Sequence, residues 1–226
     1  MRWQTLSQAK WILLVLAVLT VAAWMLSGWA ALVPAAMIVF TLYFFRDPDR
    51  TIPGELGLLV SPADGLVTDI GEMEEKEVTG ERMLRVGIFL SVFDVHVNRA
   101  PATGRVVYTA EHPGNYHDAR SPMASTHNAA RTWAFDCDGT ILVVRQITGA
   151  IARRIVPWAL LGDRLARGEH FGMIRFGSRT EIFVPPGTEI SVKIGQHVKG
   201  GSTVLGRLAA GGGSGNQERA KETVVA

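Results

Sequence analysis

Two long apolar runs near the N-terminus constrain the fold of this chain more than any other feature. Residues 11–26 and 30–45 carry no charged side chain, and only residues 27–29 separate them. Each run alone is shorter than the ~20 residues that a straight helix needs to cross about 30 Å of hydrocarbon, and together they are too long for one crossing. The pattern predicts an N-terminal hydrophobic helical hairpin over residues 1–46, either a tight hairpin or a re-entrant pair, that anchors the chain in a membrane.

Basic residues flank both apolar runs. Arg2 and Lys10 precede the first run, and Arg46 and Arg50 follow the second. Because positively charged flanks stay in the cytoplasm, both ends of the hairpin are expected there, where Arg46 and Arg50 could contact lipid phosphates. A secretory signal peptide is the competing interpretation, but no small-residue cleavage site is followed by a polar segment. We therefore expect attachment to the cell membrane, with the remaining domain on the cytoplasmic side.

The charge and the cysteine content exclude several classes of function. The formal net charge is only +2 and the arginines are scattered, so no nucleic-acid partner is expected. Cys137 is the single cysteine, which excludes an internal disulfide and any metal site built from several cysteines. His117 and His127 lie in a polar loop at a spacing that gives no metal-ligand signature, and we predict no bound metal.

The remainder of the chain is patterned like a β protein. From Thr51 onward, short apolar runs are broken by glycine, proline and aspartate, which predicts a mainly β (β-rich α+β) domain over residues 47–209. Residues 149–170 are compatible in part with a helix, although Pro157 should break or kink it. Residues 210–226 are glycine-rich and then polar, so we expect a flexible tail there.

A pair of glycines interrupts one of these strand-like stretches. Gly200 and Gly201 run directly into Ser202 and Thr203. Glycine inside a strand loses side-chain packing and costs backbone entropy, so the pair indicates a turn, a bulge or a close approach of the backbone to another group. Taken alone, the stretch is typical of an ordinary hairpin turn.

Two other residues stand out by their setting. Asp64 lies in the stretch SPADG, which is a turn by composition. His96 lies in FDVHVNRAP, where strand alternation places it on the same face as Asp94 and Asn98. A single histidine on a strand is more often structural than catalytic, so neither residue alone indicates chemistry.

Taken in order, five stretches resemble a known family. They are FFRDPDRTIP, SPADG, LSVFDVHVNRAP, GEHFGMIRFGSRTEIFVP and VKGGSTVLG, and the resemblance runs from about Phe44 to Leu208. Together they resemble the short, proenzyme form of the phosphatidylserine decarboxylases. The resemblance implies a carboxy-lyase of phospholipid biosynthesis, made as a zymogen, that carries a covalent pyruvoyl cofactor and cleaves itself between Gly201 and Ser202.

The residue types suit the self-cleavage that the resemblance implies. The Ser202 hydroxyl would attack the Gly201 carbonyl, and glycine has no Cβ to obstruct that approach. The ester would then eliminate, which leaves a carboxylate on Gly201 and a dehydroalanine that hydrolyses to the pyruvoyl group and ammonia. The resemblance assigns the base role to Asp64 and His96, by analogy with a hydrolase triad. Where longer members carry a second histidine, this chain has Arg99.

The resemblance also implies a substrate and partners. The pyruvoyl carbonyl would condense with the amine of phosphatidylserine and draw electrons as CO2 leaves, and His96 is the candidate proton donor that yields phosphatidylethanolamine. Arg175, Arg179, His117 and His127 are candidate substrate-binding residues, although the two arginines fit a purely structural strand equally well. The expected partners are the lipid bilayer and the two cleaved chains, which would remain together as a heterodimer.

Three alternatives stay open. A membrane-tethered β-domain without catalysis would use the Gly-Gly-Ser stretch as a plain hairpin turn and would remain one intact chain. A Ser-His-Asp hydrolase is a second alternative, but Ser202 is followed by Thr203 and Val204, so the G-x-S-x-G pattern of a nucleophile elbow is absent. A decarboxylase acting on a related phosphoserine lipid would use the same headgroup chemistry.

Overall fold

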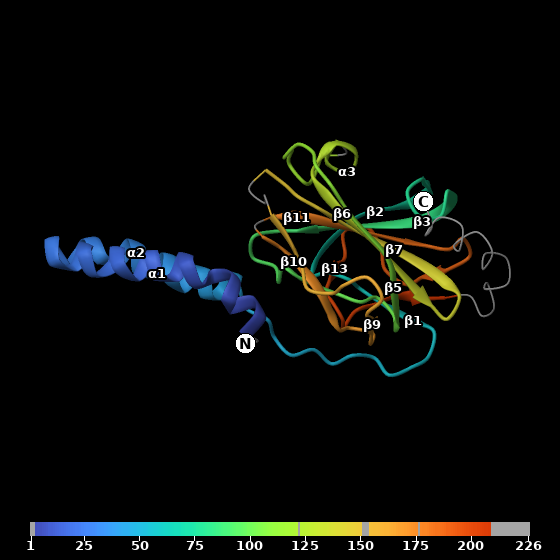
Figure 1. Cartoon of the computed structure of the whole chain (residues 1–226), viewed down its shortest axis with the longest axis horizontal. Coiled ribbons are helices and arrows are strands. Elements are labelled where there is room, and N and C mark those ends of the chain that lie inside the picture. The colour runs from blue at the N-terminus through green and yellow to red at the C-terminus, as the bar shows by residue number, and fades with distance from the viewer. Residues whose placement is uncertain (1–2, 122, 151–153, 176, 209–226) are drawn as a thin grey trace. The chain divides into compact units, whose positions relative to one another are not determined.

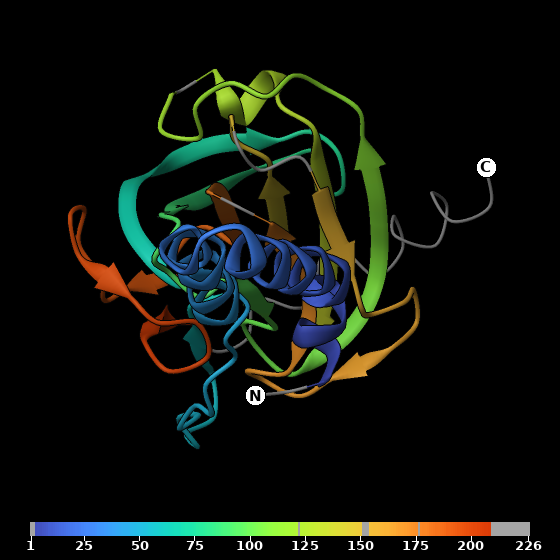
Figure 2. The ribbon, with the colours of Figure 1, turned by 90° about the vertical axis from the view of Figure 1, so that its left-hand side faces the viewer.

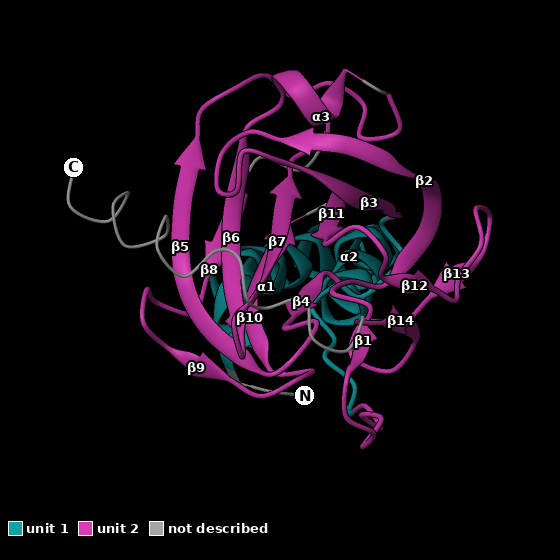
Figure 3. Cartoon of the chain, turned by 90° about the vertical axis from the view of Figure 1, so that its right-hand side faces the viewer, with its two compact units in different colours: residues 1–49, 92–95 teal, residues 50–91, 96–226 magenta. Residues whose placement is uncertain are grey.

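The computed structural model describes residues 3–121, 123–150, 154–175 and 177–208. The chain divides into two compact units, one of residues 1–49 with 92–95 and one of residues 50–91 with 96–226 (Figure 3). The predicted tail, residues 210–226, lies outside the described residues.

The first unit is a helical hairpin. Helix α1 (Trp3–Leu26) is followed by a 3-10 turn, η1 (Gly28–Ala31), and by helix α2 (Leu32–Phe44), which runs back along α1 (Figure 1). The prediction that both apolar runs are too short to cross a bilayer is wrong for the first. No proline or glycine interrupts residues 3–10, so α1 begins before residue 11, and its 23 residues Gln4–Leu26 contain an 18-residue window of mean hydropathy 2.2.

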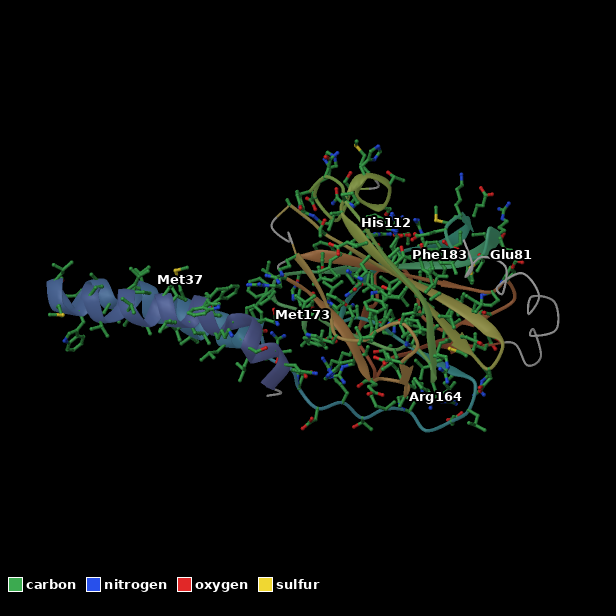
Figure 4. All side chains as sticks on the ribbon, viewed as in Figure 1. Met37, Glu81, His112, Arg164, Met173 and Phe183 are labelled. Atoms are coloured by element: carbon green, nitrogen blue, oxygen red, sulfur yellow. The ribbon has the colours of Figure 1, made fainter. Side chains whose placement is uncertain are left out.

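The outer surface of the hairpin is apolar. Figure 4 shows side chains along the length of both helices, and the labelled Met37 projects from their surface. Trp24, Met25 and Leu26 are each at least 70% exposed at the turn end of the hairpin. A soluble protein rarely exposes so large a contiguous apolar surface, and these helices therefore suggest association with a membrane.

Residues 92–95 belong to the first unit because the end of α2 binds them. The Arg46 Nη2 donates a hydrogen bond to the Phe93 carbonyl at 2.7 Å, and the Tyr43 hydroxyl donates to the same oxygen at 3.3 Å. The Arg46 guanidinium also stacks on the Tyr43 ring, 3.9 Å from its centroid, which adds a cation–π attraction. This contact joins the end of the hairpin to the segment that immediately precedes His96.

The second unit is built on one antiparallel sheet. Its eight strands lie in the order β13 (His197–Val198), β2 (Gly65–Glu75), β3 (Glu81–Leu90), β11 (Ser178–Val184), β7 (Thr140–Ile147), β6 (Ala130–Cys137), β5 (Gly104–His112) and β9 (Arg164–Leu165). The sheet curls strongly, so that β2 and β5 curve around opposite sides of the unit (Figures 2 and 3). The predicted fold class, mainly β with an N-terminal helical hairpin, is confirmed.

Two small sheets complete the unit. One holds β1 (Leu58–Val60), β14 (Val204–Arg207) and β12 (Glu189–Ile190), and the other holds β4 (Val97–Arg99), β10 (His170–Arg175) and β8 (Arg154–Pro157). Members of all three sheets share one buried apolar core. Within it the Phe171 ring of β10 contacts the rings of Trp133 and Phe135 on β6, with centroids 5.3 and 5.4 Å apart.

The predicted helix over residues 149–170 is wrong. The described part of this stretch contains strands β8 and β9 joined by turns, and β8 pairs with β10. Pro157 has no N–H to donate inside a helix, and Gly162 and Gly168 adopt positive φ angles of 92° and 78° that end regular structure. Strand pairing with β10 therefore overrides the partial helical pattern.

Cys137 is a small buried residue. It is the last residue of β6 and is 7% exposed. Burial, together with the charges of Asp136 and Asp138, raises the pKa of the Cys137 thiol to about 12, so the thiol stays protonated at neutral pH.

Candidate active site

The Gly-Gly-Ser-Thr stretch forms a tight turn between β13 and β14. The backbone N–H groups of Ser202 and Thr203 both donate to the Lys199 carbonyl, at 3.1 and 2.9 Å. In return, the Lys199 N–H donates to the Thr203 hydroxyl at 2.9 Å. The turn is therefore closed from both ends, with the Gly201–Ser202 bond at its centre.

The turn rests on the SPADG stretch. The Gly201 N–H donates to the Ser61 carbonyl at 2.8 Å, and the Ser61 N–H donates to the Thr203 carbonyl at 2.9 Å. The Gly200 N–H donates to the Asp64 carboxylate, at 2.8 Å from Oδ1. The two stretches, which are far apart in the sequence, therefore form one structural unit.

Both glycines of the turn have little space around them. A Cβ on Gly200 would lie 3.2 Å from the Asp64 Oδ1. Gly201 has a φ of 77°, and a Cβ there would lie 2.9 Å from the Arg99 Cδ and 3.1 Å from the Ile52 Cδ1. The left-handed backbone and the close neighbours together require glycine at position 201.

Gly201→Ala is expected to slow self-cleavage roughly 10-fold or more. A side chain at this positive φ costs about 1–2 kcal/mol, and relief of the contact with Arg99 would move the scissile carbonyl away from Ser202. Gly187→Ala is the matched control, because Gly187 has a φ of 83° with nothing near its Cβ position. Time courses of cleavage after cell-free translation measure both variants; equal rates for Gly201→Ala and the wild type would contradict the prediction.

Asp64 is held in place on both sides of its carboxylate. It is 7% exposed, and while its Oδ1 accepts from Gly200, its Oδ2 accepts from the Arg50 Nη2 at 2.6 Å. The next residue, Gly65, has a φ of 147°, and a Cβ there would collide with the Phe89 carbonyl oxygen. The backbone conformation and the nearby Phe89 carbonyl therefore require glycine at position 65, where the chain turns from Asp64 into β2.

His96 is completely buried just before β4. Its Nε2 accepts a hydrogen bond from the Gly177 N–H at 3.0 Å, so this nitrogen is unprotonated and the neutral ring carries its proton on Nδ1. Strand β4 is also tied to the SPADG stretch, since the Arg99 N–H and the Asn98 Nδ2 both donate to the Pro62 carbonyl, at 2.9 and 3.2 Å. One short segment therefore positions Asp64 and the strand that carries His96.

Ser202 lies half-buried in the turn. Within the described residues its hydroxyl makes no hydrogen bond, whereas the backbone N–H groups of Gly201, Ser202 and Thr203 all donate to carbonyl groups. The structure brings Asp64 to the turn directly and connects His96 to the same segment through β4. The roles of Ser202, Asp64 and His96 in cleavage remain predictions.

Arg179 is enclosed by acidic partners. Its Nη2 donates to the Asp69 Oδ2 at 2.6 Å and its Nε donates to the Glu181 Oε1 at 2.7 Å. Burial alone would raise the pKa of Asp69, but hydrogen bonds from Arg179 and Thr68 outweigh it and lower that pKa. These pairs favour the structural alternative for Arg179, whose role as a substrate ligand stays a prediction.

Arg179 also lines a cavity of about 870 Å³. The described residues that line this cavity include Asp69 and Glu181 but not Asp64, His96 or Ser202. This cavity is therefore a feature separate from the Gly-Gly-Ser-Thr turn.

Arg175 has a different environment. It ends β10 and lies opposite Arg154 of β8 in the strand register. Burial, and then the positive charge of Arg154, lower the pKa of Arg175. Two neighbouring guanidinium groups attract an anion, which is consistent with a phosphate or carboxylate ligand without assigning one.

The structure brings His117 and His127 together. Their ring centroids are 6.3 Å apart in an edge-on arrangement, and the exposed His127 Nδ1 lies 2.7 Å from the Thr126 hydroxyl in the single-turn helix α3 (Ala124–His127). Among the described residues, no group of three or more His, Cys, Asp or Glu side chains is placed to hold a metal ion.

Sequence reasoning missed the role of Arg50. Its position after an apolar run indicated a membrane-flanking residue, but its side chain is only 10% exposed and pairs with Asp64. The signal available in the sequence was the short distance between RDPDR and SPADG, which allows the two stretches to meet.

Comparison with known proteins identifies the family to which this sequence belongs. The sequence model of the phosphatidylserine decarboxylases matches residues 37–206. This range includes the Gly-Gly-Ser-Thr turn, the SPADG stretch and the segment that carries His96. The chain belongs to the phosphatidylserine decarboxylase family. The match covers well over half of the chain, and the resemblance predicted from five short stretches is confirmed.

Bacterial relatives support the assignment along most of their length. The chain is 47% identical to the phosphatidylserine decarboxylase proenzyme of Symbiobacterium thermophilum over 175 residues, which is 77% of this chain and 81% of the relative. It is 43% identical to the proenzyme of Carboxydothermus hydrogenoformans over 199 residues, 88% of this chain and 93% of the relative. A proenzyme from Citrifermentans bemidjiense is 45% identical over 181 residues.

Proenzymes of this decarboxylase family carry a pyruvoyl group derived from a serine. The turn at residues 199–203 fits the formation of that group from Ser202. The residue before Ser202 is a glycine with a left-handed backbone, the serine hydroxyl is not engaged by a described residue, and a buried carboxylate lies against the turn.

Proposed function

We propose that this protein is a self-processing, pyruvoyl-dependent decarboxylase that converts phosphatidylserine to phosphatidylethanolamine and CO2. The observation that carries the proposal is the hydrogen bond from the Gly200 N–H to the Asp64 carboxylate. It holds an acidic side chain against the turn, at the residue two positions before Ser202, in a chain that belongs to this family. Membership of the family supplies the reaction, and the turn supplies the candidate cleavage site.

Self-cleavage would begin at the Ser202 hydroxyl. For His96 to take the hydroxyl proton, the hydrogen bond from the Gly177 N–H to its Nε2 must first open. The serine oxygen then bonds to the Gly201 carbonyl carbon, and His96 returns the proton to the peptide nitrogen as the C–N bond breaks, which leaves an ester and a free Ser202 amine. Loss of the Ser202 Cα proton then breaks the Cβ–O bond, which gives a Gly201 carboxylate and dehydroalanine. Water converts dehydroalanine to the pyruvoyl group and ammonia. Asp64 would orient His96 and stabilise its protonated form.

In the mature enzyme, the pyruvoyl group supplies an electron sink for the loss of CO2 from the substrate. A proton must then be delivered to the carbon that has lost CO2. His96 is our candidate donor, because an imidazole can hold and release a proton near neutral pH. Arg175 beside Arg154 is a candidate ligand for the phosphate or the carboxylate of the substrate.

The fold explains how the two cleaved chains would stay together. Strand β14, which follows Ser202, is the central strand of its sheet and pairs with β1 on one side and β12 on the other. Leu205 in this strand is 1% exposed in the shared core. Ladder hydrogen bonds on both edges and a buried side chain would retain the small chain without a covalent link, as a heterodimer.

We also propose a location at the cell membrane, with the catalytic unit on the cytoplasmic side. The hairpin of α1 and α2 would hold the enzyme at the lipid surface, where its substrate is concentrated. Arg2 and Lys10 before the charge-free run of residues 11–26, and Arg46 after α2, support this orientation.

Intact mass spectrometry of the detergent-purified protein tests the proposed function. Two chains are expected, residues 1–201 and the 25 residues 202–226, with the small chain blocked at its N-terminus by a pyruvoyl group. Borohydride should add two hydrogens to the small chain by reducing the ketone. A single full-length mass under conditions of full folding would contradict the proposal and favour a non-catalytic tethered domain.

A further inference from the structure

The segment that follows the helical hairpin runs along the candidate cleavage turn. We call residues 50–58 the strap; they begin the second compact unit and lead into β1. The strap has no helix or strand before Leu58, so its position depends on side-chain and backbone contacts rather than on regular structure. Two of these contacts meet at the turn, and a third holds the strap in place.

The first contact is an ion pair. The Arg50 Nη2 lies 2.6 Å from the Asp64 Oδ2, and each side chain is 10% exposed. The other carboxylate oxygen of Asp64 accepts from the Gly200 N–H at 2.8 Å. Because Arg50 engages one oxygen and the turn engages the other, the guanidinium determines how the carboxylate is rotated toward the turn.

The second contact covers the scissile residue. The half-buried Ile52 side chain lies over Gly201 and Gly168, so closely that a Cβ on either glycine would meet the Ile52 Cδ1. The same Cβ on Gly201 would lie 3.6 Å from the Gly168 Cα. Ile52 therefore fills the space beside Gly201 on the side where a Cβ would lie.

The third contact holds the strap down. The Arg167 Nη1 donates to the carbonyls of Glu55 and Leu58, at 2.7 and 3.1 Å, and the Arg167 Nη2 donates to the Pro53 carbonyl. Arg167 precedes Gly168, the residue that Ile52 covers. One turn of the second unit therefore both clamps the strap and borders the cleavage site.

We propose that the strap is part of the self-cleavage site and that Arg50 is its positioning residue, which orients the Asp64 carboxylate for the reaction at Ser202. This inference rests on the proposed function and adds a residue to it. Arg50 touches neither of the reacting atoms and acts through Asp64. Lysine can supply the charge but not the planar fork of the guanidinium, so it should replace Arg50 only in part.

The test compares cleavage rates of freshly translated full-length chains. Arg50→Ala is expected to cleave about 100-fold more slowly than the wild type. Arg50→Lys is expected to cleave about tenfold or more faster than Arg50→Ala. Added methylguanidinium should accelerate Arg50→Ala but leave the wild type unchanged. Arg82→Ala is the matched control, since Arg82 forms an exposed pair with Glu72, and it should cleave at the wild-type rate.

The outcomes separate this inference from the proposed function. Cleavage of Arg50→Ala at the wild-type rate would overturn the role of Arg50 and leave the proposed function intact. If Arg50→Ala does not fold, Arg50→Lys and Arg50→Gln decide the matter: a faster reaction in the lysine variant supports the inference, and equal rates overturn it. An uncleaved wild-type chain would overturn the proposed function itself.

Discussion

Ser202→Ala is expected to remain one chain of 226 residues and to lose decarboxylase activity by at least about 10⁴-fold. The Ser202 oxygen is both the nucleophile and the leaving group of the proposed cleavage. The carbon atoms of Ser202 become the pyruvoyl group. Alanine removes that oxygen but leaves the backbone of the turn free to form. Intact mass and the release of labelled CO2 from phosphatidylserine measure the two consequences.

The turn should survive this substitution. Its closing hydrogen bonds come from backbone groups and from Thr203, and the Ser202 hydroxyl makes none within the described residues. Ser191→Ala is the matched control, because Ser191 is exposed outside the turn, and it should be cleaved and active. A cleaved and active Ser202→Ala enzyme would refute the proposed origin of the pyruvoyl group.

The second large effect is expected at Asp64. Asp64→Asn should slow cleavage roughly 10³- to 10⁴-fold, as the loss of charge does in a catalytic triad. Asparagine keeps the size and can still accept from the Gly200 N–H, but it offers no charge to Arg50 or to a protonated His96. His96→Ala should impair cleavage as well, because it removes the proposed base. Time courses of chain cleavage measure both variants.

Asp138→Asn is the matched control for the change at Asp64. Asp138 is exposed in the turn between β6 and β7 with a φ of 53°, a conformation that asparagine tolerates well, so cleavage should proceed normally. Normal cleavage in both Asp64→Asn and His96→Ala would remove these residues from the base role.

Local patterns in the sequence were sufficient for some features of the fold. A segment without charges beside basic flanks predicts an apolar hairpin, and alternation broken by glycine and proline predicts a β-rich domain. Both predictions depend on side-chain chemistry within a few residues, which tertiary structure does not change. The first residue of α1 was less predictable, because polar residues such as Gln4 and Ser7 continue a helix as readily as they precede one.

Long-range pairing decided what local pattern could not. Residues 149–170 have a partial helical pattern, but β8 and β9 form instead because partner strands elsewhere in the chain accept their backbone hydrogen bonds. Arg50 was expected beside the membrane, yet its side chain is buried against Asp64. In both cases a contact with another segment of the chain outweighs the local preference.

The candidate site divides in the same way. By itself the sequence determined which residues could carry the chemistry, because a serine after glycine, a turn aspartate and a strand histidine are recognisable from residue type and order. Only the tertiary structure decided that the Asp64 carboxylate meets Gly200 and Arg50, since the pairing of β1 with β14 and of β2 with β13 brings the two stretches together. Contacts of this kind depend on the closure of long loops, which no local pattern records.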